Sequence, residues 1–329
     1  MNFKLVKVDH SKVLADIEQQ DSRQRYAEGS ARRRFNTSFH TENEAPDQQI
    51  TPSEKPYSFK RWLPLILRSR GLASSDAQVV AFSHSQARLL LRVANASIPS
   101  CSINRMYRED IDEDIVPVFR SLFFPPEGLF MRLAACSAKD GMQTRPGKPA
   151  LRSVEDILLL LLTSLRARNA LVDAIEEGVG IIELFFIPWN SRMRSEREYR
   201  VFCPPFRLGN SPRITAISQY RWYKQWLLYP ASDNLQKEAM GKIVEGSNEI
   251  LKQIAAELET NNEMDNLLMR QGLTFDVFFD EERDSIHLVE LNVFGVRSAC
   301  GSCLFQWIWD RNTLEGRGES EELEFRVTY

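Results

Sequence analysis

The spacing of apolar residues changes several times along this chain, and each change predicts a new element. Apolar residues recur at helical spacing over residues 86–96, 153–175 and 232–259. Ser153, and Ser232 or Asp233, stand where a cap of the first turn is expected. Shorter apolar runs predict strands over residues 129–134, 181–187, 199–203, 214–219, 274–279 and 286–291, with the polar sequence EERDS as a hairpin turn. Strands joined by hairpins and interrupted by helices predict an α+β fold.

Residues 1–55 lack this regularity. They are polar, with the sequences ARRRFN, HTENEAPDQQ and TPSEK in series. Such a composition buries too little apolar surface to offset the entropy lost on ordering the chain. We therefore expect a flexible extension over residues 1–55, with a short helix near residues 8–20, and a folded domain over residues 56–329.

The amino-acid composition excludes several classes of protein. The chain has 329 residues, 43% of them hydrophobic, so it can bury a sizeable core. A formal net charge of -3 argues against a general nucleic-acid binder, which needs a basic excess. The longest apolar run, residues 157–162, is too short to cross a membrane. Five cysteines, an odd and sparse set, indicate a reducing compartment, so we expect a cytoplasmic protein without membrane contact.

The predicted terminal hairpin, TFDVFFDEERDSIHLVELN, concentrates oxygen-bearing side chains. Asp276 alternates with apolar residues on its first strand, and Glu290 and Asn292 are two residues apart on its second, so they share a face. If the strands pair as expected, the three side chains converge as ligands for a hard cation such as Mg²⁺. The alternative is a half-exposed strand with ordinary polar residues facing water.

Two further segments carry basic residues. In EYRVFC, Glu198 and Arg200 share a strand face, and Arg200 could hold phosphate bidentately, although a surface Glu–Arg pair is the alternative. In FMRLAACSAKDG, Arg132 lies in a predicted strand, and Lys139 and Asp140 follow in a loop of small residues suited to phosphate. Two solvated basic residues are the alternative there, since the spacing of a Walker loop is absent.

Cys300 and Cys303 form a C-x-x-C spacing, but no second pair and no thioredoxin-like setting accompany it. We expect them to be core or loop cysteines.

In order along the chain, the pieces FMRLAACSAKDG, DILLLLLTSL, EYRVF, AISQY, FDVFF, VELNVF and SCLFQW resemble the cell division cycle protein 123 family. The resemblance runs from residue 57 to the C-terminus. It implies an ATP-grasp fold, with two lobes of antiparallel sheet and helices that close on a nucleotide cleft, and binding of ATP with Mg²⁺. Differences in the loop 134–141 and in the segment 185–189 make the chain similar to a diverged paralogue rather than to the housekeeping member.

The resemblance also implies roles for particular residues. It assigns Asp276, Glu290 and Asn292 to the metal and Arg200 to phosphate. If the protein is an enzyme, Arg132, Lys139 and Arg200 would offset the charge that develops during phosphoryl transfer. The remaining residues implied to line the nucleotide site are Arg132 in place of a family lysine, Asp140, Glu198, Ser218, and Phe186, Ile187 and Trp189 in the adenine-contacting linker.

Two functions fit these expectations. In the first, the protein is a ligase that activates a small carboxylate as an acyl-phosphate and joins it to an amine. The sequence Glu290-Leu291-Asn292 favours this function, because it is similar to the Glu-x-Asn of ATP-grasp ligases. In the second, as the family resemblance implies, the protein is an ATP-binding assembly factor for translation initiation factor two and contacts its gamma subunit.

Overall fold

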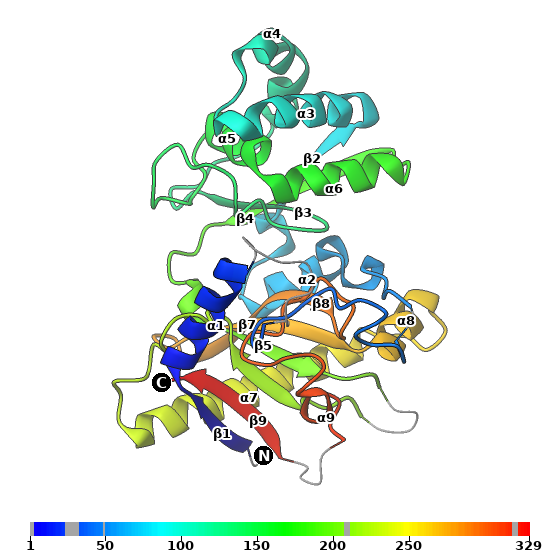
Figure 1. Cartoon of the computed structure of the whole chain (residues 1–329). Helices are drawn as coiled ribbons and strands as arrows, with labels where there is room; N and C mark the ends of the chain where they lie inside the picture. Colours follow the sequence, from blue (N-terminus) through cyan, green and yellow to red (C-terminus); the bar gives the residue numbers. More distant parts are fainter. Residues whose placement is uncertain (1–2, 24–32, 49, 207–210, 318–321) are drawn as a thin grey trace. The chain divides into compact units, whose positions relative to one another are not determined.

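The computed structural model describes residues 3–23, 33–48, 50–206, 211–317 and 322–329 (Figure 1). The chain divides into two compact units, each with its own sheet. Unit 1 comprises Met1–Tyr57, Arg61–Arg70 and Arg192–Tyr329, and unit 2 comprises Ser58–Lys60 and Gly71–Ser191.

Unit 1 is built on a six-stranded sheet in the order β1-β9-β6-β5-β7-β8. The pairs β1–β9 and β9–β6 are parallel and the other three are antiparallel, so the expectation of purely antiparallel sheets is wrong for this unit. The α+β prediction is confirmed, as is the hairpin of the last two predicted strands. The strands are β1 (Phe3–Val8), β5 (Glu198–Cys203), β6 (Ala216–Gln219), β7 (Leu273–Asp280), β8 (Ser285–Val293) and β9 (Leu323–Thr328).

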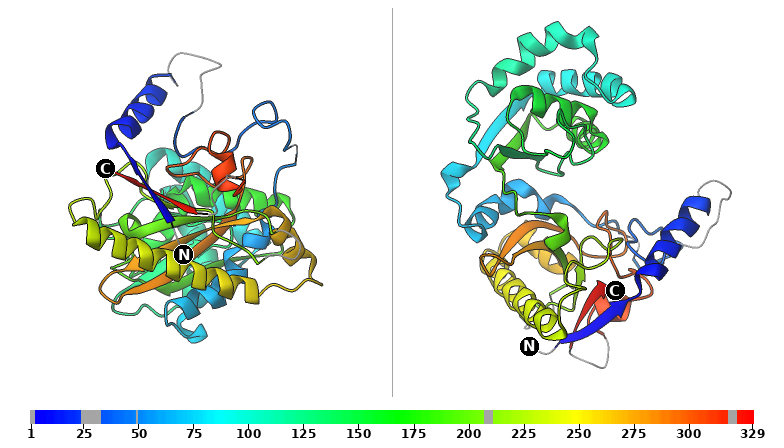
Figure 2. Two further views of the ribbon diagram at one scale, coloured as in Figure 1. Left: turned by 90° about the horizontal axis from the view of Figure 1, so that it is seen from below. Right: turned by 90° about the vertical axis from the view of Figure 1, so that its left-hand side faces the viewer.

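Helix α7 (Asp233–Ala256) packs along one face of this sheet (Figure 2). It begins where the sequence predicted, because the Ser232 side chain accepts a hydrogen bond from the amide of Leu235. Close packing on β8 requires Gly246, since an added Cβ would lie 2.3 Å from Cγ1 of Ile286. The opposite face of the sheet is therefore the one that can carry a site. The other helices of unit 1 are α1 (His10–Arg23), α2 (Phe59–Ser69, whose first two residues belong to unit 2), α8 (Glu263–Gln271), α9 (Arg311–Leu314), η1 (Lys55–Tyr57) and η7 (Ser195–Arg197).

The N-terminal segment is not a flexible extension where the structure describes it. Strand β1 pairs with β9 from Phe3↔Leu323 to Val8↔Thr328, and the two strands lie side by side in Figures 1 and 2. Helix α1 follows and confirms the short predicted helix. The few apolar residues of this polar segment, such as Val13 and Phe35, pack against elements remote in sequence, which local composition cannot reveal. Residues 1–2, 24–32 and 49 lie outside the described part of the chain.

Unit 2 holds a three-stranded antiparallel sheet in the order β2-β4-β3. Helices α3, α5 and α6 bury their apolar faces with one side of it in a single core cluster, drawn in cyan and green in Figure 1. Strand β2 was not predicted. The elements are β2 (Gln78–Ser83), α3 (His84–Ser97), β3 (Leu129–Leu133), α5 (Val154–Thr163), α6 (Leu165–Glu176), β4 (Ile181–Pro188), and the short helices η2 (Ser74–Asp76), η3 (Ile98–Ser100), η4 (Arg105–Tyr107), α4 (Arg108–Asp110), η5 (Ile111–Ile115) and η6 (Val116–Phe119).

The single helix expected over residues 153–175 is two helices. Ser153 caps the first by accepting from the amide of Asp156, as predicted. Ser164 then adopts an extended conformation, with ψ 120°, and its side chain accepts from the amide of Ala167 to cap the second. The apolar stripe continues across the break, which explains why helical spacing did not reveal it.

Candidate functional site

A row of polar side chains crosses the face of the unit 1 sheet opposite α7. Strand register places Arg326, Ser218, Arg200, Asp276 and Glu290 side by side on β9, β6, β5, β7 and β8. All but Glu290 are buried. Directly opposed residues of neighbouring strands have their side chains on the same face and in contact range. We call this row the sheet-face site.

The centre of the row is a buried ion pair. The Arg200 guanidinium donates from Nε to Oδ1 of Asp276 at 2.8 Å and from Nη2 to Oδ2 at 2.7 Å. Burial lowers the pKa of Arg200, but attraction to Asp276 outweighs it and holds that pKa well above the ordinary value. Arg200 also donates from Nη1 to the carbonyl of Gly301 at 2.6 Å. The guanidinium is thus fixed at three atoms.

The three side chains predicted to hold a metal lie on one face. Asp276 pairs with Glu290, and Asn292 pairs with Thr274, the residue two before Asp276 on the same strand. The prediction that these three side chains share one face of the sheet is therefore confirmed. Among the described residues, no group of three or more His, Cys, Asp or Glu side chains could hold a metal. A cation here would therefore depend on the Asn292 amide and on oxygens of its ligand.

Those donors fit a hard cation. Asp276 and Glu290 bring two carboxylates to the same point, and each carboxylate oxygen offers more than one lone pair, so Arg200 does not exhaust Asp276. The Nδ2 atom of Asn292 is buried with no hydrogen-bond partner in the described part of the chain, so this N–H group is open to an acceptor such as a phosphate oxygen, while a cation would use Oδ1 of the amide. Oxygen donors of this kind are those Mg²⁺ prefers.

A buried cysteine borders the row. The Sγ of Cys300 lies 3.0 Å from Oγ1 of Thr274, and burial raises the pKa of this thiol to about 11 against the opposing effect of Arg200. Cys303 is also buried. Both were expected to be core or loop cysteines, and their burial in the loop after β8 confirms it.

The other predicted residues of unit 1 also lie near Arg200. Ser218 is its neighbour on β6, and its Oγ accepts from the amide of Leu304 at 3.1 Å. Glu198 precedes Arg200 by two residues on β5 and shares its face. The structure thus brings the six predicted residues of unit 1 to one face, namely Glu198, Arg200, Ser218, Asp276, Glu290 and Asn292.

Sequence analysis missed the continuation of the row on β9. Arg326 donates to both carboxylate oxygens of Asp310, at 3.0 and 2.9 Å, and Arg34 binds the same carboxylate at 2.7 and 3.1 Å. Burial raises the pKa of Asp310, but the hydrogen bonds and charges of Arg34 and Arg326 outweigh it and lower that pKa. The alternation of Glu324 and Arg326 with apolar residues in LEFRVT was the available signal.

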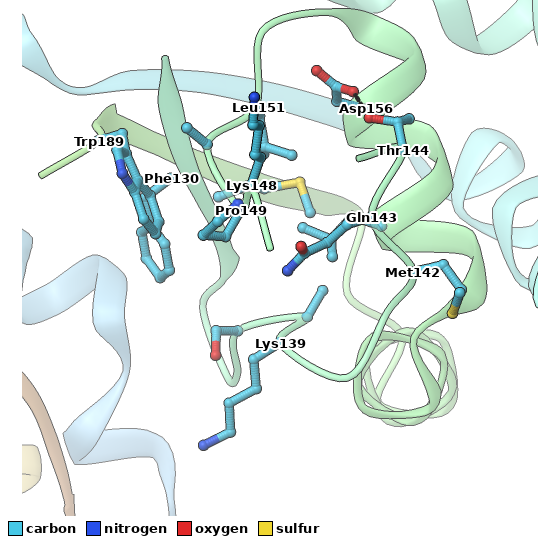
Figure 3. A pocket seen from close by; sticks show the side chains of 15 residues that line it. Phe130, Lys139, Met142, Gln143, Thr144, Lys148, Pro149, Leu151, Asp156 and Trp189 are labelled. Atoms are coloured by element: carbon cyan, nitrogen blue, oxygen red, sulfur yellow. Dashed lines mark hydrogen bonds between the residues drawn. The ribbon is translucent and has the colours of Figure 1, made fainter. Parts of the chain in front are cut away.

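Unit 2 carries a cavity of about 160 Å³, which we call the loop pocket (Figure 3). Phe130 and Trp189 stand together on one wall, and Met142 and Leu160 contribute to the lining. Asp156 lies at the far end, where it accepts hydrogen bonds from the Thr144 hydroxyl and the Arg152 amide. The cavity is largely apolar, and the Asp156 carboxylate holds its loop through these two hydrogen bonds.

Two predicted side chains contribute to this pocket. Trp189 and Lys139 both line it, and the exposed Lys139 projects at one end in Figure 3. Ile187 pairs with Phe130 across β4 and β3, so it shares the strand face of that aromatic wall.

The structure does not bring the other predicted residues of unit 2 into the pocket. Arg132 lies on β3 with its guanidinium 4.5 Å from the ring of Phe59. Phe186 faces the opposite side of the sheet, in the helix-covered core, so its side chain is not available to a ligand. Asp140 accepts from the Ser164 hydroxyl at 2.5 Å and from the Arg166 amide at 3.1 Å, at the start of α6. Its carboxylate therefore caps a helix.

Comparison with solved structures identifies the architecture. The structure of Cdc123 from Schizosaccharomyces pombe superposes with a TM-score of 0.54 at 20% sequence identity, over 89% of this chain and 100% of that one. The chain has the fold of Cdc123. The C-terminally truncated form of S. pombe Cdc123 matches equally, with a TM-score of 0.54, 19% identity and the same coverage. At this identity the likeness establishes the Cdc123 fold alone, and at that level it confirms the resemblance found in the sequence.

Sequence-based comparisons add nothing to this result. No protein-family model matches the chain, and the search of curated proteins found no match. Among the described residues, no helix combines the length and the apolar character needed to span a membrane.

Proposed function

We propose that this protein binds Mg²⁺·ATP and acts as an ATP-dependent assembly factor on a protein partner. The observation that carries the proposal is the alignment of Arg200, Asp276 and Glu290 in one cross-strand row. A fixed guanidinium beside two carboxylates offers one partner for phosphate oxygens and one for a divalent cation. Such preorganised groups need little rearrangement when a charged ligand binds.

In this proposal, Asp276, Glu290 and the Asn292 amide hold the cation and Arg200 holds a phosphate oxygen. The cation, when bound, would offset the charge of the triphosphate. Separately, the loop pocket of unit 2 offers the positive charge of Lys139 and the flat apolar surface of Phe130 and Trp189.

The fold favours an assembly factor as the role. The similarity covers 100% of the solved S. pombe Cdc123 chain and 89% of this one. The partner proposed on the sequence resemblance is the gamma subunit of translation initiation factor two.

A carboxylate–amine ligase is the second candidate. Glu290 and Asn292 leave the same strand face two residues apart, which is the Glu-x-Asn arrangement of ATP-grasp ligases. In that case Arg200 would stabilise charge on the transferred phosphoryl group, and no side-chain nucleophile would be required.

The test is nucleotide binding by the variant Glu290→Gln, measured by calorimetry with and without Mg²⁺. We expect a loss of about tenfold or more in Mg²⁺-dependent affinity for ATP, because a charged ligand of the cation is removed. Glu282→Gln, in the exposed turn of the same hairpin, is the matched control and should bind as the parent does. Equal affinity in Glu290→Gln would refute the metal assignment.

Two further measurements separate the candidate roles. ATP-dependent capture of the purified initiation-factor gamma subunit supports the assembly factor. Release of ADP and phosphate that depends on an added amine and carboxylate supports the ligase.

A further inference from the structure

The N-terminal segment reaches the loop that lies on the sheet-face site. We call residues 34–40 the strap and residues 298–304 the site loop. Four main-chain hydrogen bonds join the strap to the site loop or to Val296, two residues before that loop. They run from Asn36 to Cys303, from Ser302 to Thr37, from Phe39 to Ser298 and from His40 to Val296, at 2.6 to 3.1 Å. Hydrogen bonding of this density holds two otherwise irregular segments together.

Side chains complete the contact. Oδ1 of Asn36 accepts from the amide of Cys303 at 3.2 Å, and Oγ of Ser302 accepts from the amide of Thr37 at 2.9 Å. Gly301 has no room for a Cβ, because that atom would lie 2.3 Å from Oδ1 of Asn36. The Asn36 side chain therefore sits directly against the Gly301 backbone.

Backbone strain concentrates here. Five non-glycine residues of the described chain have a positive φ, and three of them are Asn36 (50°), Phe39 (48°) and Cys303 (51°). For a bulky residue such as Phe39 this conformation is costly and persists only where surrounding contacts determine it. Strained backbone of this kind clusters at functional sites.

The site loop in turn fixes the polar row. Its Gly301 carbonyl accepts from Nη1 of Arg200 at 2.6 Å, and the Leu304 amide donates to Oγ of Ser218 at 3.1 Å. The Leu304 carbonyl accepts from Nη1 of Arg326 at 3.1 Å. Three neighbouring members of the row thus depend on this one loop for a hydrogen bond.

From these contacts we infer that Asn36 is a positioning residue of the sheet-face site, which sets the Gly301 carbonyl and through it the Arg200 guanidinium. The inference rests on the proposed function in one respect, namely that Arg200 holds phosphate. Loss of the Asn36 side chain leaves the main-chain hydrogen bonds in place but removes the group that packs against Gly301 and accepts from the Cys303 amide, so the Gly301 carbonyl is no longer held and Arg200 loses its third fixed contact.

The decisive variants follow from the φ of Asn36. Asn36→Gly removes the side chain without adding strain, because glycine adopts positive φ readily. Asn36→Asp keeps an oxygen acceptor for the Cys303 amide and tolerates this conformation, so it serves as the conservative rescue. Thr41→Ala lies just beyond the strap, where the hydroxyl binds Glu44, and is the control.

Two readouts are measured on each variant. The first is Mg²⁺·ATP affinity, which we expect to fall about tenfold in Asn36→Gly while Asn36→Asp and Thr41→Ala stay within about twofold of the parent. The second needs no nucleotide and is the rate at which phenylglyoxal modifies Arg200, followed by mass spectrometry. That rate should rise severalfold in Asn36→Gly alone.

The outcomes are distinguishable. Unchanged Arg200 modification in a folded Asn36→Gly variant overturns the inference, and so does unchanged affinity when the parent binds Mg²⁺·ATP. If the parent does not bind Mg²⁺·ATP, the proposed function fails, and the modification rate of Arg200 alone then decides whether Asn36 positions it.

Discussion

The sheet-face site of unit 1 and the loop pocket of unit 2 hold their polar groups by different means. In the sheet-face site, the strand register aligns Arg200 and Asp276, and both are buried. In the loop pocket, the chain between β3 and α5 forms much of the lining, and the exposed Lys139 stands at its end. The first arrangement compensates its charges internally, whereas the second leaves a cation at the surface.

This difference decides what each residue does for stability. A buried charge needs its partner, because burial without compensation costs several kcal/mol. An exposed lysine contributes little to folding, because water screens its charge. We therefore expect substitutions in the sheet-face site to damage folding and binding together, and substitutions in the loop pocket to separate the two.

The largest effect is expected for Asp276→Ala. It leaves the Arg200 guanidinium buried without its main counter-charge, so the free energy of unfolding should fall by about 3–5 kcal/mol in urea denaturation. Glu282→Ala removes an exposed carboxylate from the turn of the same hairpin, 3.9 Å from Arg192, and should cost about 1 kcal/mol or less.

A small loss of unfolding free energy in Asp276→Ala would contradict this contrast between the sheet-face site and the loop pocket. If it costs no more than Glu282→Ala, the row is not an internally compensated site, and its burial has another origin.

The same difference explains how much the sequence revealed. The period of two along β5, β7 and β8 could be recognised because apolar and polar residues alternate there. It predicted correctly that Glu198 and Arg200 share a face, and that Asp276, Glu290 and Asn292 do, but not that β5 pairs with β7. The helix caps at Ser153 and Ser232 could also be predicted, because a capping side chain binds an amide only three residues later in the sequence. Cdc123-like architecture followed from the order of short pieces along the chain.

Other features depended on contacts that no local pattern contains. Strands β1 and β9 pair across the whole length of the chain, so a polar N-terminal composition suggested flexibility where β1 forms an edge strand. The run LFFIP in β4 is apolar throughout, and without alternation nothing showed that Phe186 faces the core. Asp140 could not be recognised as a cap before α6 was known to start at Leu165.

Alkaline pH should lower the free energy of unfolding through groups of unit 1. The expected effect is smaller than that of Asp276→Ala. Burial raises the pKa of Cys203 to about 12 and that of Cys300 to about 11, both from 9.0, and both thiols lie in unit 1. Burial also raises the pKa of Tyr57, Tyr199 and Tyr220 in the same unit. In unit 1, therefore, protons held by the folded state are released on unfolding.

The sign follows from that difference. Above pH 9 the unfolded thiols lose protons that the folded thiols retain, so stability is full below pH 9 and falls as pH rises. Between pH 7.5 and 10 the two thiols together should lower the free energy of unfolding by about 2–3 kcal/mol. Cys300→Ala should remove roughly half of this slope, and Cys101→Ala, at an exposed position of unit 2, should leave it unchanged. An unaltered slope in Cys300→Ala would show that this thiol is not the protonated buried group described.

The smallest effect is expected in unit 2, for Asp140→Ala. Its carboxylate accepts from Ser164 and Arg166 at the first turn of α6, so its loss should cost about 1 kcal/mol, as for other helix caps. Affinity for Mg²⁺·ATP should stay within about twofold of the parent, whereas Lys139→Ala should weaken binding and leave stability within about 0.5 kcal/mol. Thermal unfolding and calorimetry on the same preparations measure both quantities. If Asp140→Ala instead weakens nucleotide binding without loss of stability, Asp140 is a ligand of the nucleotide after all, and the separation of folding from binding in the loop pocket does not hold.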